Sequence, residues 1–195
     1  MRPPPYPRGM EDKAFTAAVE TVLKHEGGFS ADPNDPGGAT HYGISLRYLL
    51  SIHAVDTDGD GFSDFDFDRD GDIDAHDIRA MTRGAAIEIY RDHFWTPNGY
   101  GDLPPFVGPK VFDLAVNMGP RQAHKLLQRA ARACEANLTD DGVLGPKTRA
   151  AIAGLPPMQV VAATRSEAAG FYRTLIAEKP KLEIYRTGWL RRAYA

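Results

Sequence analysis

The chain has 195 residues, enough for one domain with a substantial core, and its 43% hydrophobic and 10% aromatic content excludes a disordered protein. Its single cysteine, Cys134, excludes an intramolecular disulfide, and no stretch approaches the roughly 18 apolar residues of a membrane span. Residues 56–77 contain ten Asp and one Arg, a net charge of −9, so the rest of this chain of net charge −3 carries +6. A basic body favours a polyanionic target such as a cell wall, although ordinary solvated charge explains it equally well; the acidic cluster favours a cation.

The N-terminal segment, residues 1–10, is rich in proline and predicts an extended or frayed arm. It lacks the apolar run of a secretory signal peptide. We therefore expect the protein to be made in the cytoplasm without a signal peptide. If it acts in the cell wall or periplasm, a separate factor has to release it.

Residues 11–26 predict a helix, because apolar side chains recur at helical spacing and Gly27-Gly28 ends the pattern. Glu26 lies on the apolar face, so desolvation and the negative end of the helix dipole should raise its pKa. A carboxylic acid with a raised pKa is the proton donor that cleavage of a glycosidic bond needs. Asp35, in a polar turn, should stay ionised. From spacing alone, a C-terminal Glu and a turn Asp explain the pattern equally well.

Residues 29–40 predict turns and a short hairpin, and residues 46–52 predict a short helix. The acidic insert, residues 56–77, follows and contains two near-copies of one loop at a ten-residue offset. The second copy fits the EF-hand pattern, with a glycine at position 6 and an Asp rather than a Glu at position 12. Its candidate Ca²⁺ ligands are Asp66, Asp68, Asp70, Asp72 through its carbonyl, Asp74 through a water, and Asp77.

The first copy of the loop is less complete, because its twelfth position is Phe67. It binds Ca²⁺ weakly, borrows a carboxylate from the second copy, or binds nothing. Its candidate ligands are Asp56, Asp58, Asp60 and Asp64. We expect one structural Ca²⁺ in the second loop and treat the first as the less certain site. The alternative is a disordered acidic loop.

The rest of the chain predicts further helices: residues 82–95, capped by Thr82, and, after a proline-rich break at 103–109, three more around residues 111–116, 123–134 and 158–176. Three side chains are candidates for substrate binding: Tyr42, Trp95 and Asn117. Packing explains the two aromatic residues as well, and a helix cap explains Asn117. Cys134 lies in an apolar stripe and is expected to be a buried structural thiol. His25 is expected to be a solvated residue at a helix end, with its role left open.

The segment "HEGGFSADPNDPGGATHYGIS" resembles the N-terminal signature of the glycoside hydrolase 108 muramidases, many of them phage endolysins. It is also similar to the Glu, Asp, Thr arrangement of phage-type lysozymes, here Glu26, Asp35 and Thr40, with one residue fewer between the last two. Downstream, "YRDHFW", "VFDLAVNMGPRQAHKLLQRA" and "DDGVLGPKTRAAI" resemble the second half of the family, which is associated with peptidoglycan binding. The last of these resembles a turn, with the bend at Asp141 and Gly142.

The resemblance implies a mainly α, lysozyme-like fold with a small β-hairpin region and the EF-hand-type insert. It implies a catalytic region at residues 11–102 and a helical, peptidoglycan-binding-type half at 103–195. The expected reaction is hydrolysis of the β-1,4 bond between N-acetylmuramic acid and N-acetylglucosamine, with Glu26 as general acid. Asp35 and Thr40 then hold the attacking water in an inverting route; in a retaining route, Asp35 or the substrate is the nucleophile.

Two other classes of function stay open from the sequence: a muramidase-like scaffold or localisation protein with little activity, and a calcium-dependent adaptor. The second needs two complete loops and leaves Glu26 unexplained. For the hydrolase we expect bacterial peptidoglycan as partner, no nucleic acid, no membrane insertion and a monomer.

Overall fold

The computed structural model describes residues 8–25, 28–31, 38–52, 56–57 and 59–195, and side chains within these ranges except those of residues 8–12 and 25. The described residues are mainly helical with one two-stranded hairpin, which confirms the expected fold class. The chain forms two compact units. We call residues up to Thr21 together with Arg91–Ala195 the helical unit, and Val22–Tyr90 the hairpin unit.

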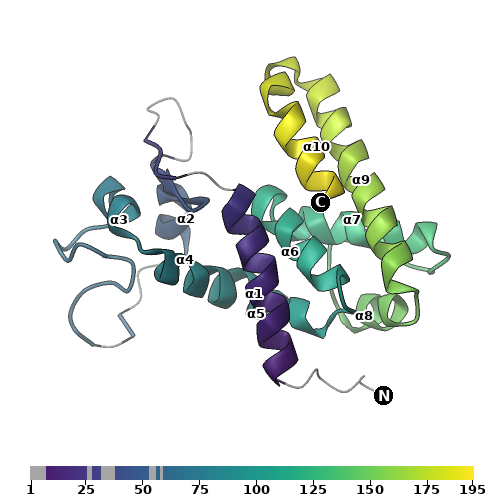
Figure 1. Ribbon diagram of the computed structural model, residues 1–195, viewed down its shortest axis with the longest axis horizontal. Helices are drawn as coiled ribbons and strands as arrows, with labels where there is room; N and C mark the ends of the chain where they lie inside the picture. Colours follow the sequence, from purple (N-terminus) through teal and green to yellow (C-terminus); the bar gives the residue numbers. More distant parts are fainter. Residues whose placement is uncertain (1–7, 26–27, 32–37, 53–55, 58) are drawn as a thin grey trace. The chain divides into compact units, whose positions relative to one another are not determined.

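The helical unit is built from the first part of α1 (Arg8–His25) and from long helices that pack against one another. α7 (Pro120–Ala133) contacts both α6 (Val107–Met118) and α9 (Pro157–Glu178), and α10 (Arg186–Tyr194) lies along α9 (Figure 1). The apolar stripes expected from the sequence supply this core. Shorter elements connect the helices: a π-helix at Arg91–Trp95, α5 (Thr96–Asn98), 3-10 turns at Tyr100–Asp102 and Pro180–Tyr185, and α8 (Pro146–Ala153).

Four aromatic rings form the centre of the helical unit. Trp95 meets Phe15 and Phe112 edge to face, with ring centroids 5.5 and 5.4 Å apart, and Tyr100 lies 6.1 Å from Trp95. All four side chains are buried. This packing places the start of α1 and residues 91–102 in one core with the C-terminal helices, so the compact units do not coincide with the sequence ranges 11–102 and 103–195.

The hairpin unit contains β1 (Thr40–His41) and β2 (Ile44–Ser45), paired antiparallel with Thr40 opposite Ser45. Tyr42 and Gly43 connect them with φ of 51° and 79°, the two positive values of a type I′ turn. Ser45 then caps α2 (Leu46–Ser51), accepting a 3.2 Å hydrogen bond from the Tyr48 backbone. The unit also contains α3 (Ala75–Ala80) and α4 (Arg83–Tyr90).

Three helices depart from the sequence expectations. α3 begins within the insert, where only loops were expected, and continues beyond it to Ala80, and α10 lies beyond the last predicted helix. α8 occupies the "GPKT" segment, although the bend before it forms as expected, with Gly142 at a φ of 80° and the Asp141 carboxylate 2.8 Å from the Val143 amide. The predicted helix at 82–95 begins with Thr82 Oγ1 accepting from the Ala85 amide, and changes to a π-helix at Arg91.

Two helical glycines should respond in opposite ways to substitution by alanine. A Cβ on Gly108 in α6 would lie 2.2 Å from the Tyr100 carbonyl oxygen, so Gly108→Ala should lower the melting temperature despite the better helix propensity of alanine. Gly170 in α9 is exposed and a Cβ there meets nothing within 4 Å, so Gly170→Ala is the matched control and should stabilise by about 0.5–1 kcal/mol. Thermal unfolding measures both. Equal changes in the two variants would contradict the close approach at Gly108.

Candidate active site

The residues expected to perform the chemistry fall partly outside the described ranges. Glu26, Asp35 and Asp58 belong to the undescribed positions, as does the side chain of His25, so their predicted roles stay predictions. Thr40 is described and lies in β1, half-buried. Its backbone exchanges two 2.8 Å hydrogen bonds with Ser30, and its hydroxyl lies 3.4 Å from the Gly38 carbonyl. The hairpin therefore ties Thr40 to the segment that follows α1.

Tyr42, a predicted substrate-binding residue, sits at the tip of the hairpin in a left-handed backbone conformation. Its ring stacks on His41 with centroids 3.9 Å apart, and its carbonyl accepts a 2.9 Å hydrogen bond from the Tyr90 hydroxyl of α4. His41 is held in turn by a 3.0 Å hydrogen bond between Nδ1 and the Ile78 carbonyl of α3. Two helices of the hairpin unit thus fix the turn that carries Thr40 and Tyr42.

Trp95 and Asn117, the other two predicted substrate-binding residues, both lie in the helical unit. Trp95 is 2% exposed at the centre of the aromatic core, so packing explains the position of its ring. Asn117 is exposed near the end of α6, and its Oδ1 accepts a 2.8 Å hydrogen bond from the Tyr172 hydroxyl. The α6 cap is formed by Gly119 instead. Cys134 is half-buried at the end of α7 rather than fully buried.

The second loop of the insert gathers its carboxylates into two groups. Oxygens of Asp66, Asp68 and Asp70 lie within 4.8 Å of one another, and so do those of Asp72, Asp74 and Asp77. Oxygens that share a Ca²⁺ at 2.3–2.6 Å cannot be more than about 5 Å apart, so either spacing suits one ion. Within the described part of the insert, the first-loop residues Asp56, Asp60 and Asp64 join no such group.

The two loop copies nevertheless fold alike at their starts. Asp66 accepts from the Gly71 amide at 2.9 Å, and Asp56, ten residues earlier, accepts from the Gly61 amide at 3.1 Å. Arg69 of the second copy pairs with Asp60 of the first at 2.9 Å. The copies differ at the end, where only the second copy runs into a helix.

Asp77, the twelfth residue of the second loop, is fully buried in the first turn of α3. Its two oxygens accept 2.7 Å hydrogen bonds from the backbone amides of Phe67 and Asp74. Oδ1 also accepts a 3.4 Å hydrogen bond from the Asp68 amide. A carboxylate offers about four lone-pair sites, so these three bonds leave one site, on Oδ2, for a cation. The donor set, all carboxylate and carbonyl oxygen, suits Ca²⁺ better than a softer metal.

Crowding of carboxylates shifts the titration of this loop. Desolvation, together with the charges of Asp70 and Asp77, raises the pKa of Asp68. The charge of Asp70, followed by desolvation, raises the pKa of Asp72. Part of each pKa shift reflects the cost of holding like charges together, a cost that a bound cation removes.

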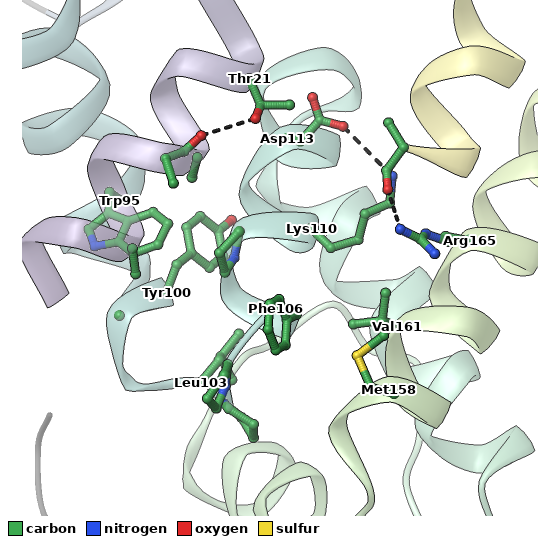
Figure 2. Close-up of a pocket in the computed structure, with 18 residues that line it drawn as sticks. Thr21, Trp95, Tyr100, Leu103, Phe106, Lys110, Asp113, Met158, Val161 and Arg165 are labelled. Atoms are coloured by element: carbon green, nitrogen blue, oxygen red, sulfur yellow. Dashed lines mark hydrogen bonds and ion pairs between the residues drawn. The ribbon is translucent and has the colours of Figure 1, made fainter. Parts of the chain in front are cut away.

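A cavity of about 420 Å³ opens in the helical unit, between α1, the proline-rich segment 103–109 and α9 (Figure 2). Its walls are mainly apolar and include Trp95, Leu103, Phe106 and Met158. Among its described lining residues the one acidic side chain is Asp113, which lies 3.8 Å from Lys110 and 3.5 Å from Arg192. Without a second acidic side chain in its lining, this cavity has no pair of Asp or Glu residues for glycoside hydrolysis.

The buried charges beside the cavity hold α10 against α6. Lys110 donates a 2.6 Å hydrogen bond to the Arg192 carbonyl, and burial lowers the pKa of Lys110 to about 8 although Asp113 opposes the shift. This arrangement secures the C-terminal helix.

Models of known protein families match both halves of the chain. Residues 19–119 match the family model described as glycosyl hydrolase 108. The chain belongs to the glycosyl hydrolase 108 family. Residues 122–194 match a model described as a predicted peptidoglycan domain. This member of the family is a glycoside hydrolase, and the second match supports peptidoglycan as its ligand and the cell wall as its place of action.

Among solved structures, this glycosyl hydrolase 108 chain is similar to Brucella abortus SagA, at 26% identity and a TM-score of 0.70, over 94% of this chain and 91% of that one. No curated protein matches the sequence. In the described part of the chain, no helix is both long enough and apolar enough to cross a membrane.

The hydrolase should lose stability in mild acid through His124. This buried ring lies between the Tyr100 hydroxyl (3.0 Å from Nε2) and the Gly142 carbonyl (3.2 Å from Nδ1), and burial lowers its pKa below 6.5. The unfolded chain therefore binds the proton more readily, and stability falls as pH drops through about 6.5 toward the folded pKa. Melting curves from pH 8 to 5 should show the advantage of wild type over His124→Gln shrinking below pH 6.5. A difference in melting temperature between wild type and His124→Gln that does not change with pH would contradict this role of His124.

Proposed function

We propose that this hydrolase is an N-acetylmuramidase that cleaves the β-1,4 bond between N-acetylmuramic acid and N-acetylglucosamine. The observation that carries the proposal is the fixed hairpin, which holds Thr40 and Tyr42 in the segment that also contains Glu26 and Asp35 in sequence. In this mechanism Glu26 protonates the leaving oxygen of the glycosidic bond. Asp35, with the Thr40 hydroxyl, orients the attacking water, and Tyr42 lines the sugar site.

The basic body of the chain and the predicted peptidoglycan domain support an anionic polymer of the wall as substrate. We further propose that the enzyme acts as a phage or prophage endolysin. It is then made in the host cytoplasm and reaches the wall when a separate factor releases it. A muramidase-like scaffold with little activity is the alternative, and activity alone separates the two.

Substitution of the proposed general acid tests the mechanism. Glu26→Gln keeps the shape of the side chain but removes the acidic proton, so lysis of purified peptidoglycan should fall about 10²–10⁴-fold. Thr40→Ala should cause a smaller loss. Glu88→Gln, an exposed glutamate in α4, is the matched control and should retain full activity. Lysis by Glu26→Gln above roughly a tenth of the wild-type rate, a barrier change under about 1.4 kcal/mol, would remove Glu26 from the acid role.

We also propose that the second loop of the insert binds one structural Ca²⁺ through the carboxylates of Asp66, Asp68, Asp70 and Asp77 and the carbonyl of Asp72. Support comes from the oxygens of Asp66, Asp68 and Asp70, which lie within 4.8 Å of one another, and from the oxygen donor set. Asp77 groups with Asp72 and Asp74 instead, and we place it in the ligand set because it is the twelfth residue of the loop. When bound, the ion neutralises the crowded carboxylates. The first loop is the weaker candidate because it lacks a carboxylate at its twelfth position.

Contacts within the hairpin unit connect this loop to the proposed catalytic turn. Asp77 and Ile78 are neighbours in α3, and the Ile78 carbonyl bonds the His41 ring beside Thr40. The Arg79 guanidinium of the same helix lies 4.3 Å from the centre of the Phe29 ring. A cation that fixes the start of α3 therefore also stabilises the contacts of this helix with Phe29 and His41.

Calcium should raise the melting temperature, and a chelator should lower it and slow lysis. A ligand that binds the folded form adds about 2.7 kcal/mol at 100 times its dissociation constant. The double substitution Asp68→Asn with Asp70→Asn should abolish the calcium-dependent rise. The control, Asp56→Asn with Asp60→Asn, makes the same charge change in the first copy. It should retain most of the calcium-dependent rise in melting temperature. Superimposable melting curves with calcium and with chelator would show that the insert is not a structural calcium site.

A further inference from the structure

The C-terminal end of the helical unit carries three stacked aromatic rings. Trp189 of α10 stacks both with Tyr172 of α9 and with Tyr185, the residue that precedes α10. The ring centroids are 5.1 and 5.3 Å apart and the planes are 24° and 22° from parallel. We call these three residues the aromatic stack.

The aromatic stack runs from the core to the surface. Tyr172 is buried and donates its hydroxyl to Asn117, Trp189 is half-buried, and Tyr185 is 49% exposed. The inner rings therefore hold the outer one at a fixed angle, because Tyr185 rests on Trp189 one helical turn away. Such a rigid, exposed ring loses little entropy when it binds a ligand.

Charged residues lie close to Tyr185 in sequence. Arg186, the next residue, pairs with Glu183, two residues before Tyr185, through two hydrogen bonds at 2.5 and 2.8 Å. The hydrogen bond from Arg186 lowers the pKa of Glu183, so the carboxylate stays ionised. Four exposed cations stand against two exposed carboxylates between residues 178 and 195: Lys179, Lys181, Arg186 and Arg191 against Glu178 and Glu183.

This chemistry fits a sugar ring with an attached carboxylate. The C–H face of a pyranose packs on the negative face of an aromatic ring, and neighbouring ion pairs bond its hydroxyl and amide groups. A membrane surface fits less well, because Trp189 is half-buried and stacks on two other rings, and because the ionised carboxylate of Glu183 lies two residues from Tyr185.

We propose that Tyr185, backed by Trp189 and flanked by Arg186, is a glycan-docking site for the N-acetylated, carboxylate-bearing sugars of peptidoglycan. This inference rests on the proposed function for its substrate class, and the site itself lies outside the catalytic segment. The site holds the enzyme on its polymer between cleavage events, so that the effective substrate concentration at the catalytic residues is raised.

The test measures binding rather than lysis. The full-length Glu26→Gln protein is sedimented at low temperature with purified sacculi freed of protein and wall polymers. Tyr185→Ala added to this background should weaken binding about tenfold, which corresponds to about 1.4 kcal/mol. Tyr185→Phe, which keeps the ring, should bind normally. Tyr194→Ala is the matched control, since Tyr194 lies on the same helix, is 52% exposed and is not part of the stack.

Unchanged binding of Tyr185→Ala to sacculi would overturn the proposal, as would an equal loss in Tyr194→Ala. Binding to anionic lipid vesicles that depends on Tyr185, with no dependence on sacculi, would overturn it in favour of a membrane surface. Melting curves of each variant confirm that the fold is retained. Because the assay measures binding without hydrolysis, its result can be interpreted even if the enzyme is inactive or is not a muramidase. The two proposals can therefore fail separately.

Discussion

Two hydrogen bonds from distant parts of the hairpin unit hold the short hairpin, and the proposed chemistry depends on them. Two-residue strands cannot hold a position by themselves, since an isolated hairpin is marginal in water. The bond between His41 and the Ile78 carbonyl fixes one strand to α3, and the bond from the Tyr90 hydroxyl to the Tyr42 carbonyl fixes the turn to α4. Helices α3 and α4 are thereby made part of the support of Thr40, although Ile78 and Tyr90 lie 37 and 48 residues beyond the hairpin residues that they hold.

In the helical unit, too, hydrogen bonds from distant side chains hold short segments in place, and here the side chains are buried and polar. Gln128 of α7 donates to the Asp141 carboxylate at 2.7 Å and to the Val143 carbonyl at 3.1 Å, and accepts from the Gly142 amide at 2.8 Å. Arg149 of α8 bonds the Gly99 carbonyl at 2.8 Å. These bonds satisfy backbone groups of loops that have no sheet or helix to pair them, so tight turns persist inside the core.

The sequence predicts the parts of the fold whose information is local. Helices α1, α6, α7 and α9 have long apolar stripes, and each forms close to its predicted range. Helices α3, α8 and α10 were not predicted, because they have only six to nine residues and weak periodicity. Pro146 at the first position of α8 is nevertheless a recognisable start signal. The burial of Trp95 depends on partners 80 residues before it and 17 after it, Phe15 and Phe112, and periodicity around Trp95 itself carries no information about them.

Left-handed residues other than glycine show where long-range contacts override local preference. Type I′ turns favour Asn or Gly at the position that Tyr42 occupies, and a bulky residue there costs on the order of 1 kcal/mol. Its stacking on His41 and the bond to its carbonyl repay that cost. Arg69, also left-handed, uses its side chain to join the two copies of the insert loop through Asp60. Local sequence therefore accounts for the long helices, while the hairpin and the insert take their shape from charges and hydrogen bonds across the hairpin unit.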